Sequence, residues 1–190
     1  MKTKANIQLF SPGIVLFDPL VLSSFLQHNG VADSNVFEQF IQDENLGRAA
    51  IENGVICPMY QISEQDYSVF IENGNDAKYE LPVPKFSYSD FPLKIKSGIM
   101  IASDLNALLD WDDDFFLSYK KRYDSRLSSN DFLEIESGLY NLTINGYVGL
   151  RSRSANCGYG LIFQAVDCLP AVSKDTFADD LDFELAGYQQ

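Results

Sequence analysis

Two apolar runs, each beginning just after a glycine, stand out along the chain. One follows Gly13 in "PGIVLFD" and ends at Asp18, and the other follows Gly98 in "SGIMIASD" and ends at Asp104. Short apolar runs bounded by turn residues are typical of buried strands. An aspartate at the end of such a run can accept hydrogen bonds from the free N–H groups of a first helical turn. The pattern therefore predicts, twice, a strand followed by a helix.

The positions of two further glycines suggest that this pattern is a sequence repeat. The spacing from Gly13 to Gly54 nearly equals the spacing from Gly98 to Gly138. The second glycine of each pair ends a similar tetrapeptide, Ile-Glu-Asn-Gly in one case and Ile-Glu-Ser-Gly in the other. We therefore expect an internal duplication. The alternative is that a glycine followed by a β-rich run is a common way to begin any strand.

The duplication sets the expected organisation of the chain. Residues 1–72 form a first repeat-like half and residues 93–170 a second one. Residues 73–92 between them contain Pro82, Pro84 and Pro92, which disfavour a helix or a central strand, so this segment is expected to be a linker or an edge crossing. Residues 171–190 form an acidic tail that is expected either to fray or to dock through its apolar residues, which are Phe177, Leu181, Phe183 and Leu185.

Apolar spacing predicts three helices. The first covers residues 19–27. The second covers residues 35–53, where Asn35 and Glu38 have the spacing of a capping box and Phe37, Phe40 and Ile41 form one apolar stripe. The third runs from 104 to about 123, with an apolar face made by Leu105, Leu108, Leu109 and Phe116.

The remaining apolar runs predict strands. In "LYNLTINGYVGL" apolar and polar residues alternate, and Asn145-Gly146 is a strong signal for a two-residue hairpin turn. The fold class expected is therefore α+β, strand-dominated and mostly antiparallel, with two similar halves around one core. The alternative is a mainly-β sandwich with helices only in the excursions.

Composition fits a globular protein of the cytoplasm. The 190 residues are 46% hydrophobic, no run reaches the length of a membrane span, and no signal peptide is recognisable. Three scattered cysteines fit free thiols in a reducing compartment better than a disulfide framework. Cys57 and Cys168 lie in apolar runs and are expected in the core, whereas Cys157 is the more exposed candidate.

The net charge of −13 narrows the choice of partners. Such a charge repels nucleic acid and anionic membranes, and it attracts basic proteins. We therefore expect a basic protein partner, no nucleic acid and no membrane, with the oligomeric state left open. The plainer interpretation is that the charge only keeps the protein in solution.

The sequence carries few groups suited to catalysis. His28 is the only histidine and stands at an expected helix end. No nucleophile motif, metal-ligand spacing or phosphate-binding loop is present. We therefore assign no catalytic residue, no cofactor and no metal ligand from the sequence.

The segment "DWDDDFF" is the most unusual stretch. Asp110, Asp112 and Asp114 alternate like the start of a calcium-binding loop, but Phe115 stands where such a loop needs glycine and Lys121 where it needs a carboxylate. Paired carboxylates can also serve as acid and base in a hydrolase, which is one alternative function.

Charge and aromatic character together favour an interface for this segment. Carboxylates steer a basic partner and aromatic side chains anchor it. The competing interpretation is a solvated helix face with its aromatic residues turned to the core. The partner-binding residues predicted are Asp110, Trp111, Asp112, Asp113, Asp114 and Phe115.

Several short motifs resemble those of known bacterial inhibitors. Asp110-Trp111, Ser97-Gly98-Ile99 and Gly138-Leu139-Tyr140 are similar to pieces found in inhibitors of the competence DNA-entry nuclease. The general plan resembles the immunity proteins of polymorphic toxin systems, and the similarity covers about Pro92 to Leu169. The resemblance implies a non-enzymatic protein that occludes a toxin or a nuclease. The alternatives are a carboxylate-dependent hydrolase and a structural or regulatory module that binds through Phe177 to Leu185.

Overall fold

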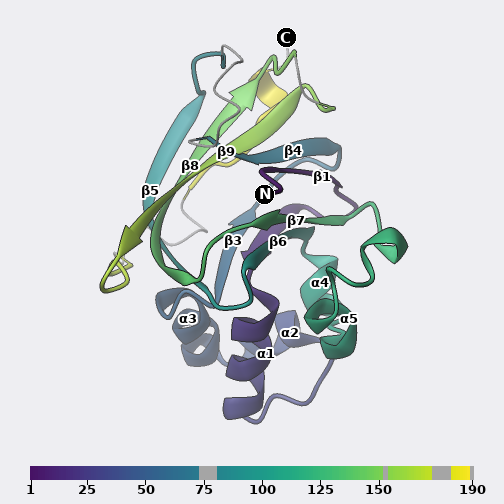
Figure 1. Ribbon diagram of the computed structural model, residues 1–190, viewed down its shortest axis with the longest axis vertical. Coiled ribbons are helices and arrows are strands. Elements are labelled where there is room, and N and C mark those ends of the chain that lie inside the picture. The colour runs from purple at the N-terminus through teal and green to yellow at the C-terminus, as the bar shows by residue number, and fades with distance from the viewer. Residues whose placement is uncertain (73–80, 152–153, 173–180, 189–190) are drawn as a thin grey trace.

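The computed structural model describes residues 1–72, 81–151, 154–172 and 181–188 (Figure 1). The strands are β1 (Lys4–Gln8), β2 (Gly13–Phe17), β3 (Ile56–Tyr60), β4 (Asp66–Ile71), β5 (Phe86–Ile95), β6 (Ile99–Asp104), β7 (Asn130–Glu134), β8 (Gly138–Val148) and β9 (Cys157–Val166). The α-helices are α1 (Pro19–His28), α2 (Val36–Gln42), α3 (Glu44–Glu52), α4 (Asn106–Leu109) and α5 (Asp113–Leu117).

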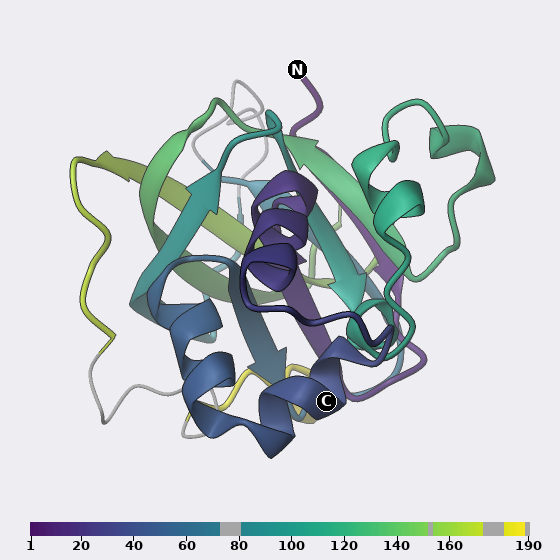
Figure 2. The ribbon, with the colours of Figure 1, turned by 90° about the horizontal axis from the view of Figure 1, so that it is seen from below.

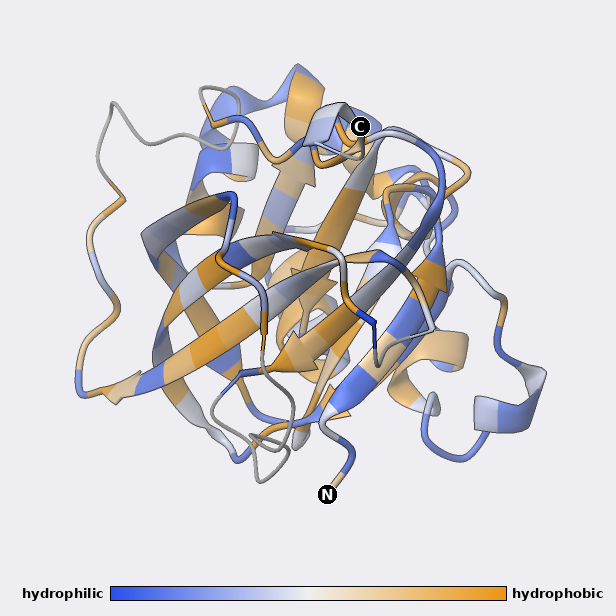
Figure 3. Ribbon diagram, turned by 90° about the horizontal axis from the view of Figure 1, so that it is seen from above, coloured by the Kyte–Doolittle hydropathy of each residue, from blue (hydrophilic) through white to orange (hydrophobic). Residues whose placement is uncertain are grey.

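The strands form two sheets. The large sheet has the order β1-β4-β9-β8-β5 and the small sheet the order β3-β2-β6-β7. All neighbouring strands are antiparallel except the parallel pair β4 and β9. The α+β class expected from the sequence is thus confirmed. Seen from above, hydrophobic and hydrophilic residues mix along the strands of the large sheet (Figure 3), as they do in a sheet with one packed face.

The layers are the large sheet, the small sheet and the helices, in that order (Figure 1). The small sheet is therefore covered on both faces, which explains the unbroken apolar run of β2. Ile14 and Leu16 pack toward the large sheet, whereas Val15 and Phe17 pack toward the helices. A strand buried on both faces reads as a continuous apolar run instead of an alternating one.

The two halves of the chain have the same strand order. In the large sheet β1 pairs with β4 and β5 with β8, and in the small sheet β2 pairs with β3 and β6 with β7. The two halves meet at the antiparallel pair of β2 and β6, and β9 has no counterpart. Each sheet therefore takes strands from both halves.

Two buried aspartates support this correspondence. Asp18 directly follows β2, Asp104 is the last residue of β6, and both are fully buried. The Asp18 carboxylate accepts hydrogen bonds from the N–H groups of Lys96 (2.8 Å) and Ser97 (2.6 Å), in the turn before β6. The Asp104 carboxylate accepts one from Phe10 N–H (3.3 Å), in the connection before β2. Each aspartate thus holds the segment that leads into a central strand of the small sheet, Asp18 the one before β6 and Asp104 the one before β2.

The second pair of glycines does not follow the repeat. Gly54 lies before β3, whereas Gly138 is the first residue of β8, and these two strands occupy different places in the two halves. Gly54 has a φ of +64°, and a Cβ atom there would come within 3.0 Å of the Leu93 backbone. The tetrapeptide match is therefore not a match of equivalent positions.

Two of the three expected helices are interrupted. The helix expected over 35–53 is divided at Asp43, and the one expected over 104–123 is divided before Asp112 and ends at Leu117. Both aspartates accept hydrogen bonds from N–H groups of the helix that follows them, so each begins a new helix. As a result Ile41 and Leu109, expected on apolar stripes, are exposed.

The expected hairpin turn is also wrong. Asn145 and Gly146 lie inside β8 and pair with residues of both β5 and β9. A Cβ atom at Gly146 would lie 2.4 Å from the ring of Phe86, so glycine is needed there for close packing and not for a turn.

Two cysteines exchange their expected places. Cys157 opens β9 and is buried between the sheets, whereas Cys168 lies beyond the end of β9 and is exposed. Cys57 is buried as expected, and burial raises the pKa of its thiol to about 12. At neutral pH Cys57 is therefore a protonated core residue.

The proline-containing segment and the tail both contribute to the fold. Pro92 lies within β5, which is an edge strand, as its missing N–H requires. Of the tail, Phe183 and Leu185 are fully buried in the core between the sheets, so the docking alternative holds for these two residues. Phe177 lies outside the described residues. Among the helices described, none is long and apolar enough to cross a membrane.

Candidate functional site

The acidic residues predicted to bind a partner lie where α4 ends and α5 begins. Asp110 follows α4, and the Asp112 carboxylate accepts a hydrogen bond from Phe115 N–H (2.9 Å) at the start of α5. Asp113 and Asp114 form the first turn of α5, where negative charge is favourable. Asp110, Asp112 and Asp114 are exposed and Asp113 is half-buried. Consecutive carboxylates are thus held at the surface of the helical layer.

The aromatic residues of this segment fasten it to the core. The indole ring of Trp111 stacks on the ring of Phe116, with centroids 4.8 Å apart, and meets Phe17 edge-on at 5.7 Å. Phe116 is buried, whereas Trp111 and Phe115 are half-buried. The alternative that the aromatic residues turn to the core therefore holds for Phe116, and it holds only in part for Trp111 and Phe115.

The aromatic contacts continue from α5 to the small sheet. Phe116 stacks on Tyr119, which meets Phe132 of β7 edge-on. Burial raises the pKa of Tyr119 far above that of a free tyrosine, and the nearby Asp131 charge raises it further. Its neutral hydroxyl donates a hydrogen bond to Asn130 Oδ1 (2.6 Å).

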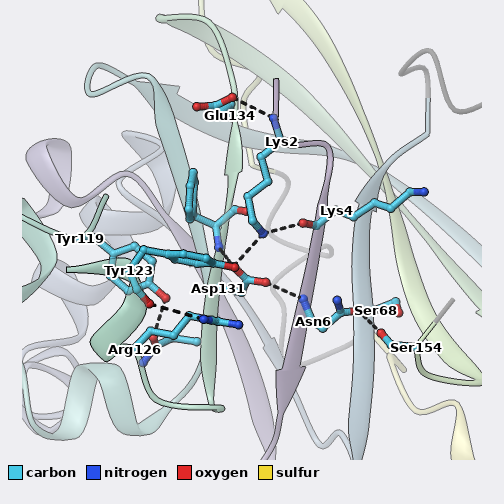
Figure 4. A network of polar contacts seen from close by, with 12 residues as sticks. Lys2, Lys4, Asn6, Ser68, Tyr119, Tyr123, Arg126, Asp131, Glu134 and Ser154 are labelled. Carbon is cyan, nitrogen blue, oxygen red and sulfur yellow. Dashed lines mark hydrogen bonds and ion pairs between the residues drawn. The ribbon is translucent and has the colours of Figure 1, made fainter. Parts of the chain in front are cut away.

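Next to these aromatic contacts lies a network of hydrogen bonds and ion pairs that the sequence did not predict (Figure 4). The Lys2 ammonium contacts Asp131 Oδ1 at 2.8 Å, and the side chain of Asp131 is only 3% exposed. Lys2 Nζ also donates to the carbonyl groups of Lys4 (2.6 Å) and Phe132 (3.0 Å), and Asp131 Oδ2 accepts from Asn6 N–H (2.9 Å). Because donors and acceptors satisfy each other here, the network joins β1 to β7 and offers no open site.

The basic residues after α5 do not form one helix with the acidic ones. Lys120 lies beyond α5 and donates to Glu134 Oε1 at 2.6 Å. This bond, together with one from Lys2 N–H, lowers the pKa of Glu134 to about 2. The single helix expected over 104–123, which would have joined these basic residues to the acidic ones, is therefore wrong, because α5 ends at Leu117.

One further carboxylate, that of Asp33, lies in a connection beside the acidic segment. The carbonyl group of Ser34, in the connection between α1 and α2, accepts a hydrogen bond from Trp111 N–H (2.8 Å). Figure 2 shows this connection passing next to the segment between α4 and α5. Asp33 and Ser34 line a groove together with Trp111 and Asp113. Sequence reasoning missed Asp33, although one signal was available: the chain has no lysine or arginine between Lys4 and Arg48.

The alternative of a carboxylate-dependent hydrolase depends on how the carboxylates of this segment are placed. Such enzymes need two carboxylates facing each other across a substrate cleft. Asp110, Asp112 and Asp114 are exposed, and the Asp112 carboxylate is used to cap α5. Within the described ranges, no group of three or more histidine, cysteine, aspartate or glutamate residues could hold a metal ion.

Comparisons with known proteins give distant likenesses only. No protein-family model matches the chain, and no curated protein matches it. Among solved structures, the inhibitor of the DNA-degrading activity of NucA from Bacillus subtilis, ComJ, is similar with a TM-score of 0.45 and 8% identity, over 86% of this chain and 95% of that chain. The product described as crocagin biosynthetic gene J is similar with a TM-score of 0.44 and 10% identity, over 85% of this chain and 96% of that one. The weak resemblance predicted from the sequence is thus also found in the fold, and at these values it says nothing of function.

Proposed function

We propose that this chain is a non-enzymatic binding protein of the cytoplasm that occludes a basic protein, namely a bacterial toxin or nuclease, in the manner of an immunity protein. The partner would contact the surface made by Asp110, Trp111, Asp112, Asp113, Asp114 and Phe115, which we call the acidic surface.

One observation supports this proposal above the others. Three side chains of the acidic surface, Asp110, Asp112 and Asp114, are exposed beside its aromatic anchors, and the chain has no lysine or arginine between Lys96 and Lys120. Unpaired negative charge on a rigid base raises the rate at which a positively charged partner docks. Half-buried Trp111 and Phe115 would supply the apolar contact that charge alone does not provide.

The test is the association rate with any toxin or nuclease encoded by an adjacent gene. The variant combines Asp110→Lys with Asp114→Lys and leaves Asp112 unchanged, because Asp112 caps α5. Association should slow by about tenfold at low salt and become less dependent on salt, since the steering charge is reversed.

A matched control changes the net charge equally at other elements. Glu136→Lys with Asp167→Lys replaces two exposed carboxylates, one between β7 and β8 and the other after β9. This control should alter the association rate by less than about twofold. Equal effects of the two double variants would place the interface elsewhere, and failure of the unmodified chain to bind such partners would contradict the proposed function.

A further inference from the structure

The groove beside the acidic surface has the chemistry of a receptor for one positively charged side chain. It lies between the C-terminal part of α1, the connection from α1 to α2, and the start of α5, and Leu26, Val31 and Trp111 form apolar parts of its wall. Asp33 and Asp113, which come from two different segments, both line it.

The indole and the groove are fixed relative to each other. The ring of Phe116 stacks on the indole of Trp111. The backbone N–H of Trp111 donates to the backbone carbonyl group of Ser34, so the connection that carries Asp33 is tied to the segment that carries Asp113. The Asp33 carboxylate also accepts a hydrogen bond from Asn35 N–H (2.9 Å), which restricts its position. A site held in this way loses little freedom when it binds.

Among the residues that the structure describes, none neutralises the negative charge of the groove. Its lining contains no lysine or arginine. In the part of the chain that the structure describes, neither Asp33 nor Asp113 takes part in an ion pair. The complementary occupant is therefore a cation.

We propose that this groove binds an arginine side chain of the basic partner, with the guanidinium group against the indole of Trp111 and between the carboxylates of Asp33 and Asp113. Arginine fits better than lysine because its planar, weakly hydrated cation stacks on an aromatic ring while it donates to carboxylates in its own plane. This assignment rests on the proposed function and names the side chain that the acidic surface recognises.

Trp111 is the only tryptophan of the chain, so its fluorescence reports on this groove directly. The full chain is titrated with hexaarginine and, separately, with hexalysine at equal ionic strength, and calorimetry measures both affinities. Hexaarginine should change the Trp111 emission and bind more tightly than hexalysine. Asp33→Asn with Asp113→Asn should weaken hexaarginine binding by about tenfold. Glu136→Gln with Asp167→Asn removes the same charge elsewhere and should weaken it by less than about twofold.

The outcomes separate this inference from the proposed function. Binding of hexaarginine without any change in Trp111 emission, or equal losses in the two double variants, would overturn the groove assignment and leave the acidic surface in place. Equal affinity for the two peptides would overturn the choice of arginine. If neither peptide binds at low salt, the groove assignment and the proposed function both fail.

Discussion

The clearest single-residue dependence concerns Asp131, whose buried carboxylate holds Lys2. Asp131→Ala would leave the Lys2 ammonium without its counter-charge and the N–H group of Asn6 without its acceptor. Removing one partner of a buried ion pair costs about 3–5 kcal/mol. Because the Lys2 side chain stays 26% exposed, we expect a loss near the lower end, about 3 kcal/mol, in urea unfolding.

Asp124→Ala is the control for this prediction. Asp124 lies in the short 3₁₀ turn Tyr123–Ser125 close by and is exposed. A surface substitution of this kind changes the free energy of unfolding by no more than about 0.5 kcal/mol. If Asp131→Ala lowers the free energy of unfolding as little as Asp124→Ala does, the contacts of Asp131 with Lys2 and Asn6 contribute nothing to stability.

At this scale the sequence predicts local partners and not distant ones. The caps at Asp18 and Asn35 could be predicted, since each accepts from an N–H group two or three residues further on. The pairing of Lys2 with Asp131 could not, because it depends on β1 lying beside β7, which no local pattern encodes. Asp33 was missed for the same reason, as its closeness to Trp111 comes from the packing of two connections.

Among the elements, the segment 181–188 makes a prediction about pH. Burial would raise the pKa of Glu184, but hydrogen bonds from Ser63 and from the N–H groups of Ala186 and Leu185 outweigh it and lower the pKa. Distances of 2.6–2.8 Å from Ser63 to Glu184 Oε2 show how closely the segment is held to the turn after β3. A lowered pKa means that the ionised form stabilises the fold above the usual glutamate range and that this stability is lost as the pH falls.

Glu184→Gln should therefore lower the free energy of unfolding by about 1 kcal/mol at pH 7. The difference between the variant and the unmodified chain should shrink as the pH falls below about 4.3 and the unmodified Glu184 takes up its proton. Urea unfolding at several pH values measures this. Glu64→Gln replaces an exposed carboxylate in the same turn and should have no effect. A loss that stays constant from pH 7 to pH 3 would contradict the role of the charge.

Strands were easier to predict than helices, and the reason is physical. β2 and residues 99–102 of β6 are apolar throughout because both faces of the small sheet are covered, so these strands are visible in the sequence. The helical segments carry aspartates that can start a helix, and a periodic apolar pattern does not reveal that Asp43 or Asp112 divides it. The predicted acidic surface stays together because it is a single short segment.

For the whole molecule, the interlocking of the two halves decides how the chain unfolds. Both sheets contain strands from residues 1–72 and from residues 93–170, and Asp18 and Asp104 each bind the connection that enters the other half. Neither half can therefore bury its own apolar surface alone. We expect one cooperative transition in urea. Trp111 fluorescence, which reports on the helical layer, and far-ultraviolet circular dichroism, which reports on all helices and strands together, should give the same midpoint. Two separated midpoints would mean that the layers or the halves unfold independently. The two halves would then share a strand order without stabilising each other.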